Sequence, residues 1–221
     1  MTLLDFLFPK RCVGCGRIGS YVCVACAVMM ERVKSNEAIC PMCQRRAHGG
    51  VTHPGCKRAY AIDGLTSFFR YKGVVRKAIK TLKYRLVSDL AWELMSHISL
   101  SAVSADMLIP IPLHRERIRN RGFNQAEVLG SLLAARLNIP VQNDILCRTR
   151  HTHPQAGIQQ KEERLSNMKN AFLIKKGSHG IRGLRIILFD DVVTTGATLR
   201  AAASVLKRAG AKSVWAITLA R

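Results

Sequence analysis

The stretch RIILFDDVVTTGATL, residues 185–199, joins an apolar run to two adjacent acids and a small, hydroxyl-rich turn. The run at residues 186–189 predicts a buried strand, and the helix after the turn should begin near Leu199. Ligands of open α/β sheets bind beyond the carboxyl ends of the strands, where a loop leads into the next helix. The stretch therefore predicts a sheet and a binding site at the edge of that sheet.

The turn has the chemistry of a phosphate site. Backbone N–H groups at a helix N-terminus attract anions, threonine hydroxyls add donors, and Gly196 lets a ligand approach the backbone closely. Asp190 and Asp191 would repel a phosphate, so they suit sugar hydroxyls or Mg²⁺. Together these residues predict a site for a ribose 5-phosphate, with both acids at a solvent-facing strand end. A helix cap with small turn residues would account for only one acid and one threonine.

The chain after residue 60 alternates between strand-like and helix-like segments. Val75, Ile79 and Leu82 fall at helical spacing among lysines, which predicts a basic helix over residues 74–85 with a solvated face. Further expected elements are an amphipathic helix over residues 88–104, a strand over 107–112, a helix ending near Asn138 and a last strand over 213–220. This alternation predicts an α/β domain with a mainly parallel sheet and helices on both faces.

Cysteines set the first quarter of the chain apart, because seven of the eight lie between Cys12 and Cys56. The segments CVGC, CVAC and CPMC each hold a pair separated by two residues, and HPGC supplies a fourth pair from a histidine and a cysteine. This spacing is typical of structural Zn²⁺ sites, and eight ligands suffice for two ions. In chain order the predicted ligand sets are Cys12, Cys15, Cys23 and Cys26, and Cys40, Cys43, His53 and Cys56.

The cysteine pattern leaves some alternatives open. An interleaved arrangement, first pair with third and second with fourth, fits the same spacing. His48 competes with His53 for the last position, but His53 keeps the pair spacing. Redox pairs are disfavoured, since a thioredoxin-type site uses one pair beside a βαβ pattern and here there are four without one. The metal either builds a module that contacts DNA or a partner, or replaces a core too small to stand alone.

Composition and charge bound the class of protein. We expect a double zinc-binding module over residues 1–60 and the α/β domain over residues 61–221. The net charge of +21 and a pI near 10.4 indicate a polyanionic partner, either nucleic acid or a phosphorylated small molecule. No apolar run approaches the roughly 20 residues that cross a bilayer, and the N-terminus does not read as a signal peptide. We therefore expect a cytoplasmic protein without membrane insertion.

The segment ILFDDVVTTGATL resembles the fingerprint with which type I phosphoribosyltransferases bind phosphoribosyl pyrophosphate (PRPP). The resemblance implies that Asp190 and Asp191 bind the ribose 2- and 3-hydroxyls and that the turn binds the 5-phosphate. It also implies a pyrophosphate loop after an earlier strand, with Mg²⁺ bridging the pyrophosphate and ribose oxygens. The implied PRPP-binding residues are Asp190, Asp191, Val192, Val193, Thr194, Thr195, Gly196, Ala197 and Thr198, and the implied pyrophosphate loop is Pro112, Leu113 and His114.

A narrower resemblance covers nearly the whole chain. The cysteine pairs, RYKGVVRKAIKTLKY, PIPLHRERIRNRGFNQAEVL, RTRHTHPQAGIQQKEERLSNMKNAF and the fingerprint follow one another as in the ComF family of bacterial competence proteins. This resemblance implies a role in natural transformation, the uptake of exogenous DNA. It places the protein in the cytoplasm, where single-stranded DNA enters. A competence helicase and a recombination mediator are the implied partners.

The same features fit three functions. The first is a PRPP-binding competence protein that handles single-stranded DNA, the second an active phosphoribosyltransferase with an unidentified acceptor, and the third a PRPP-sensing regulatory scaffold. Residues 151–172 resemble the mobile hood that closes over PRPP, whereas His114, His151, His153 and Cys147 have no partner at catalytic spacing. Candidate contacts to pyrophosphate or DNA are Arg115, Arg117, Arg119, Arg121, Arg148 and Arg150, with Lys161 as a further pyrophosphate candidate.

Overall fold

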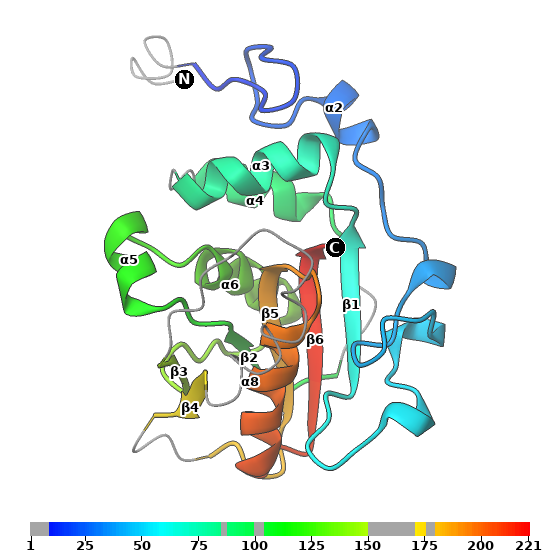
Figure 1. Ribbon diagram of the computed structural model, residues 1–221. Coiled ribbons are helices and arrows are strands. Elements are labelled where there is room, and N and C mark those ends of the chain that lie inside the picture. Colours follow the sequence, from blue (N-terminus) through cyan, green and yellow to red (C-terminus); the bar gives the residue numbers. More distant parts are fainter. Residues whose placement is uncertain (1–8, 85–87, 100–103, 150–170, 176–179) are drawn as a thin grey trace, which may run out of the picture.

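A four-stranded parallel sheet forms the centre of the protein in a computed structural model that describes residues 9–84, 88–99, 104–149, 171–175 and 180–221 (Figure 1). Its strands are β1 (Gly64–Phe69), β2 (Met107–Pro110), β5 (Arg185–Val192) and β6 (Ser213–Ala220). They lie in the order β1-β6-β5-β2, and every neighbouring pair is parallel. The predicted mainly parallel sheet is confirmed.

Helices cover both faces of this sheet, as predicted. On one face lie α3 (Gly73–Tyr84), α4 (Ser88–Ser96) and α6 (Gln125–Leu137). On the other face lies α8 (Ala197–Arg208), together with a small antiparallel pair of strands, β3 (Leu146–Arg148) and β4 (Phe172–Ile174). The arrangement is the three-layer architecture expected for parallel sheets.

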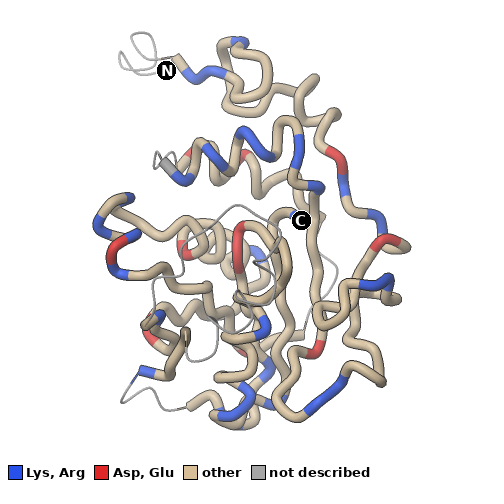
Figure 2. The backbone as a smooth tube through the Cα atoms, viewed as in Figure 1, with Lys and Arg blue, Asp and Glu red and all other residues tan. Residues whose placement is uncertain are grey.

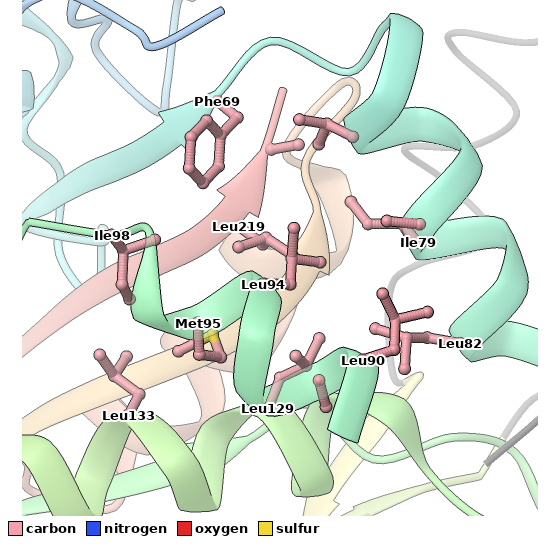
Figure 3. Close-up of a cluster of buried hydrophobic side chains, with 14 of the residues drawn as sticks. Phe69, Ile79, Leu82, Leu90, Leu94, Met95, Ile98, Leu129, Leu133 and Leu219 are labelled. Atoms are coloured by element: carbon pink, nitrogen blue, oxygen red, sulfur yellow. The ribbon is translucent and has the colours of Figure 1, made fainter. Parts of the chain in front are cut away.

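Alternation along β5 explains why both faces are covered. Ile187 and Phe189 belong to the core under α3, α4 and α6, whereas Ile186 and Leu188 belong to the core under α8. Successive side chains of a strand point to opposite faces, so a continuous apolar run needs a partner layer on each side. Figure 3 shows the first core, in which the labelled side chains from β1, α3, α4, the segment just after α4, α6 and β6 converge: Phe69, Ile79, Leu82, Leu90, Leu94, Met95, Ile98, Leu129, Leu133 and Leu219.

Three helices differ from the prediction. The helix expected over residues 88–104 ends at Ser96. The arginine-rich segment is itself a short helix, α5 (Arg115–Arg121), which ends at Gly122 in the left-handed conformation. Helix α8 begins at Ala197, two residues before the expected start, because Gly196 adopts the left-handed conformation as its N-cap (φ 70°).

The N-terminal segment, residues 9–63, runs past α3 and α4 and then along β1 (Figure 1). It contains one turn-length helix, α2 (Val24–Val28), and three 3-10 turns, Ser35–Glu37, His48–Gly50 and Pro54–Cys56. Single β-bridges join Arg32 to Phe69 and Val51 to Gly64, at the two ends of β1. Four of its buried residues belong to the same hydrophobic cluster as α3 and α4: Cys12, Val22, Cys26 and Met30.

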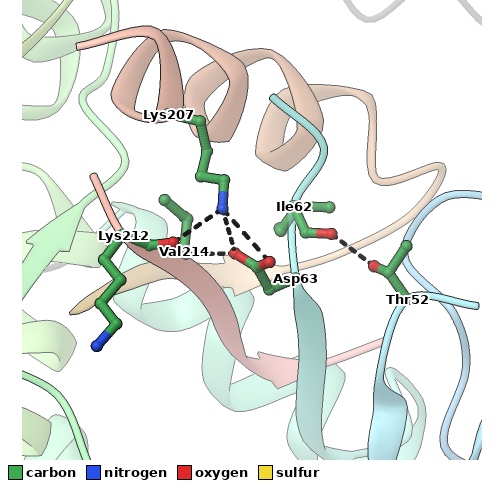
Figure 4. A network of polar contacts seen from close by, with 6 residues as sticks. All are labelled: Thr52, Ile62, Asp63, Lys207, Lys212 and Val214. Carbon is green, nitrogen blue, oxygen red and sulfur yellow. Dashed lines mark hydrogen bonds and ion pairs between the residues drawn. The ribbon is translucent and has the colours of Figure 1, made fainter. Parts of the chain in front are cut away.

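A polar network fixes the chain where it enters β1 (Figure 4). The Asp63 carboxylate accepts hydrogen bonds from the Val214 backbone N–H at 2.8 Å and from the Lys207 ammonium at 3.0 Å. Lys207 also donates to the Lys212 carbonyl, and the Thr52 hydroxyl donates to the Ile62 carbonyl. The network therefore joins the N-terminal segment, α8 and the start of β6. Within the part of the chain that the structure describes, no helix has the length and apolarity to cross a membrane.

Candidate functional site

The two acids of the quoted stretch lie near the carboxyl end of β5. Each carboxylate accepts a hydrogen bond at 2.9 Å from the next backbone N–H, Asp190 from Asp191 and Asp191 from Val192. These bonds fix both carboxyl groups against the backbone. Asp191 is buried, with 4% of its surface exposed, so the expectation of a solvent-facing acid is wrong for that residue. Asp191 lies beneath helix α3, the side from which its counter-ion comes.

That counter-ion is Lys83, in the last turn of α3. Its ammonium lies 2.9 Å from Oδ2 of Asp191, and only 24% of the Lys83 side chain is exposed. The helix was expected to present a solvated basic face, and this lysine departs from that expectation by turning inward. Burial, and then the charge of Asp191, raise the pKa of Asp190 well above its usual range, while Lys83 lowers it.

The threonine-rich turn follows directly and leads into α8. The Thr195 hydroxyl accepts a long hydrogen bond from the Ala197 backbone N–H at 3.4 Å. Gly196 is buried, and the twelve-residue helix α8 begins immediately after it. The turn thus stands at the N-terminus of a long helix, the position that favours an anion.

The N-terminal segment packs against this turn and contacts it through hydrogen bonds. The Gln44 side-chain amide donates to the Thr194 carbonyl at 3.2 Å. The Arg200 guanidinium donates to the Thr195 carbonyl at 2.7 Å and to the Pro41 carbonyl at 2.9 Å. The segment between two predicted metal ligands, Cys40 and Cys43, is therefore joined to the turn. Sequence spacing gives no signal for the Gln44–Thr194 and Arg200–Pro41 contacts, which join residues more than 140 positions apart.

The predicted pyrophosphate loop lies beside the acids because β2 pairs with β5. Pro110 is in register with Phe189, and the Ile111 backbone N–H donates to the Phe189 carbonyl at 2.8 Å. Asn124 fixes the residue just before the loop, because its side-chain amide donates to the Ile111 carbonyl at 3.0 Å. The loop residues Pro112, Leu113 and His114 follow, and His114 caps α5 by accepting from the Glu116 backbone N–H.

Basic residues are frequent along α3 and α5 (Figure 2). Arg115 and Arg119 are exposed on α5, and Arg121 donates to the Gln125 side-chain oxygen at 3.1 Å. Arg148, on β3, places its guanidinium 5.5 Å from the centre of the Phe172 ring. Burial, and then the charge of Arg117, lower the pKa of Arg148, and the charge of Asp190 opposes this. The predicted candidates Arg150, His151, His153 and Lys161, and nearly all of the predicted hood, lie outside the described residues.

The predicted metal ligands form two clusters in chain order. One brings together Cys12, Cys15, Cys23 and Cys26, and the other Cys40, Cys43, His53 and Cys56, with the ligand atoms of each set within 4.8 Å of one another. Cys15 Sγ lies 3.7 Å from Cys23 Sγ, close to the edge of about 3.8 Å for a tetrahedron with metal–sulfur bonds of about 2.3 Å. The interleaved pairing is thereby excluded, and each cluster could hold a metal ion.

The surroundings of the clusters suit metal binding. His53 Nδ1 lies 3.4 Å from Cys43 Sγ, while its Nε2 lies 2.8 Å from the Arg46 carbonyl oxygen. A hydrogen bond to that carbonyl orients the ring and leaves Nδ1 for a metal. Burial raises the pKa of Cys12, but backbone N–H groups from Cys23, Cys15 and Gly14 lower it to about 6. Such donors stabilise the thiolate, the form that binds metal.

Comparison with known proteins decides the family. The family described as "Phosphoribosyl transferase domain" matches residues 124–221. "Competence protein ComFC" of Bacillus subtilis is 30% identical over 213 residues, which cover 90% of this chain and 84% of the relative. The chain belongs to the ComF family. Its phosphoribosyltransferase-like fold rests on the family match over residues 124–221 and on the topology of the sheet.

Other relatives of this ComF protein carry related names. "DNA utilization protein YhgH" of Escherichia coli O157:H7 is 29% identical over 207 residues, 89% of each chain. "Competence protein F" of Haemophilus influenzae is 38% identical over 116 residues, which span 52% of this chain and half the length of that relative. Among solved structures, the glutamine PRPP amidotransferase of B. subtilis matches 66% of this chain and 26% of its own, with 20% identity and a TM-score of 0.37.

Several residues at the site of this ComF protein were not found by sequence reasoning. Asn124 is 3% exposed and caps α6 by accepting from the Ala126 backbone N–H, besides holding the Ile111 carbonyl. Its place before a helical segment was a signal for the cap, but not for the contact with the loop. Lys83 and Gln44 reach the site from other segments, so only the fold reveals them, whereas Arg200 lies in the first turn of α8.

Proposed function

We propose that this ComF protein binds PRPP at the carboxyl ends of β2 and β5 and handles single-stranded DNA during DNA uptake. One observation carries the proposal: the pairing of β2 with β5 places the acids, the threonine turn and the loop after β2 at one edge of the sheet. Open parallel sheets bind ligands at this edge. The competence names of the relatives support the role in DNA uptake.

In the proposed complex each part of PRPP lies against residues that suit its chemistry. Asp190 and Asp191 accept hydrogen bonds from the ribose 2- and 3-hydroxyls, since carboxylate oxygens can each accept more than one bond. The turn over residues 194–198 holds the 5-phosphate at the N-terminus of α8. The loop of Pro112, Leu113 and His114 would hold the pyrophosphate, and Mg²⁺ bound with PRPP would offset the negative charge of the pyrophosphate.

Nucleic-acid binding is proposed from the charge and its distribution. The chain carries +21 overall, and exposed arginines project from α5 beside the predicted pyrophosphate loop. Cations of this kind neutralise backbone phosphates and release counter-ions. The proposed setting is the cytoplasm at the point where the strand enters, with the helicase and the recombination mediator as further proposed partners.

The metal is proposed to be zinc, one ion in each cysteine cluster. Four sulfur or nitrogen donors within 4.8 Å of one another match the ligand number and type of a closed structural zinc site, which supports this proposal. We also propose that the chain divides into a double zinc module over residues 1–60 and a phosphoribosyltransferase-like domain over residues 61–221. Metal analysis of the reduced protein should find two zinc ions per chain.

Calorimetric titration with PRPP and Mg²⁺ tests the nucleotide part of the proposal. The pair Asp190→Asn and Asp191→Asn removes both charges but keeps acceptors for the two backbone N–H groups. We expect this variant to lose at least about 100-fold in affinity, as two hydrogen bonds from ribose to charged acceptors are weakened. Asp89→Asn, an exposed carboxylate on α4, is the matched control and should bind PRPP normally. Unchanged affinity of the double variant would refute the ribose role.

Salt dependence tests the DNA part. Binding to an unstructured oligonucleotide should weaken steeply as salt rises, since each neutralised phosphate of a single strand contributes about 0.7 to the logarithmic slope. Arg115→Ala with Arg119→Ala should reduce the slope by about 1.4. Arg182→Ala with Lys212→Ala removes two exposed cations at the opposite end of the sheet, and that control should leave the slope unchanged. A flat salt response of the wild type would exclude backbone neutralisation.

A further inference from the structure

Lys83 differs from the other basic residues of α3. Arg76, Lys77 and Lys80 are exposed, and Lys77 donates to the Gly14 carbonyl of the first cysteine cluster. Lys83 instead turns toward the sheet, where its ammonium lies 2.9 Å from Oδ2 of Asp191, a side chain that is 6% exposed. Within the described part of the chain, this is the ion pair that reaches the two acids of β5.

The helix that carries Lys83 is held firmly in place. Val75, Ile79 and Leu82 are at most 2% exposed and pack into the core shared with α4, α6 and the sheet. Leu82 and Lys83 are adjacent, so the packing that buries the leucine also fixes the backbone from which the lysine extends. The ammonium is therefore presented to Asp191 by a packed helix and not by a loose surface chain.

The acids need such a partner because they are adjacent, with Asp191 buried and Asp190 half-buried. Asp191 Oδ1 accepts a hydrogen bond from the Val192 backbone N–H, and Oδ2, which accepts no hydrogen bond from the described residues, is in ion-pair contact with Lys83. These two contacts set the rotation of the carboxylate from opposite ends. Two other charged groups lie near the Asp191–Lys83 ion pair, the Asp190 carboxylate and the Arg148 guanidinium on β3. The neighbouring strand β6 contributes the neutral Thr218. Lys83 is the cation in direct contact.

We propose that Lys83 is a positioning residue of the PRPP site, which orients Asp191 so that the acid pair can accept the ribose hydroxyls. This inference rests on the proposed function and adds a residue from a different helix to the binding machinery. It specifies the part of the ligand concerned: Lys83 acts on recognition of the hydroxyl-bearing face of the ribose, not on recognition of the 5-phosphate. A buried carboxylate without its cation would lose both its orientation and its compensating charge.

The test compares Lys83→Met with Lys83→Arg and with Lys80→Met. Lys80→Met removes the same charge one turn earlier in α3, at an exposed position, and is the matched control. Binding of ribose 5-phosphate and of 2-deoxyribose 5-phosphate is measured for each protein, besides binding of PRPP with Mg²⁺. Thermal unfolding reports whether each variant is folded.

We expect Lys83→Met to weaken binding of PRPP and ribose 5-phosphate by at least about tenfold, about 1.4 kcal/mol. Binding of the deoxy sugar, which already lacks one hydroxyl, should fall less. Lys83→Arg should recover most of the affinity, because a guanidinium can also pair with Asp191, and Lys80→Met should behave as the wild type.

Several results would overturn the inference. Equal losses for both sugars, or no recovery with arginine, would assign Lys83 a structural role only. Tighter binding by Lys83→Met would make the lysine a competitor of the ligand. If the wild type bound neither PRPP nor ribose 5-phosphate, the proposed function itself would fail, and this inference with it. A wild type that binds both ligands beside a Lys83→Met variant of equal affinity would refute the Lys83 inference alone.

Discussion

The Asp190 carboxylate is a single group whose ionisation opposes folding. Burial, and then the neighbouring Asp191 charge, raise its pKa in the folded protein well above the value near 3.9 of an unfolded chain. The folded state therefore holds the proton more tightly than the unfolded state does. The resulting stabilisation is fully present below about pH 4 and is lost as the pH rises through the raised pKa.

Asp190→Asn should therefore make the protein more stable at pH 8, by about 0.5–2 kcal/mol. The asparagine oxygen can still accept from the Asp191 backbone N–H, so the local hydrogen bond is kept. Urea unfolding at pH 8 and pH 5 measures the difference from the wild type, which should shrink at the lower pH. Asp89→Asn, at an exposed site, should show no such gain. A less stable Asp190→Asn protein at pH 8 would mean that the charge is well compensated in the fold.

At the scale of elements, the sequence predicts best where one periodicity covers a whole segment. The last strand, β6, has the bounds expected from its apolar run, and β5 and α3 are close to theirs. Strand β1 was not predicted, because Thr66 and Ser67 interrupt its apolar character. Both polar side chains find partners only across the sheet, Thr66 with the Trp215 ring N–H and Ser67 with the Thr218 hydroxyl.

The polar network before β1 should contribute measurably to the free energy of unfolding. Asp63→Ala removes the acceptor of the Val214 backbone N–H and of Lys207, whose side chain is 18% exposed. Because a buried donor is left without its partner, we expect a loss of about 1–3 kcal/mol in the free energy of unfolding. Asp89→Ala breaks the exposed pair with Lys10 and should cost less than about 1 kcal/mol. Urea titration of both variants measures the contrast, and equal losses would deny the Asp63 network its role.

At the scale of the whole molecule, the two cysteine clusters have different neighbours. The first lies against α3 and α4, where Lys77 donates to the Gly14 carbonyl and the Val22 backbone N–H donates to Glu93. The second lies against the threonine turn, through Gln44 and through the Arg200 bridge to Pro41. The sequence predicted both ligand sets and the turn, but not that one set adjoins the turn, because that contact depends on how distant segments pack.

This difference predicts that metal loss from the second cluster alone weakens PRPP binding. Cys43→Ser and Cys15→Ser each remove an exposed ligand of one cluster, and each should lower the metal content by about one ion per chain. Without its metal, the segment over residues 40–44 no longer fixes the Thr194 carbonyl through Gln44 or the Arg200 guanidinium through the Pro41 carbonyl, so PRPP affinity should fall about tenfold or more in Cys43→Ser. Cys15→Ser should keep near-normal affinity while folded. Equal PRPP affinities in two variants that have each lost one metal ion would show that the turn keeps its shape without the second cluster.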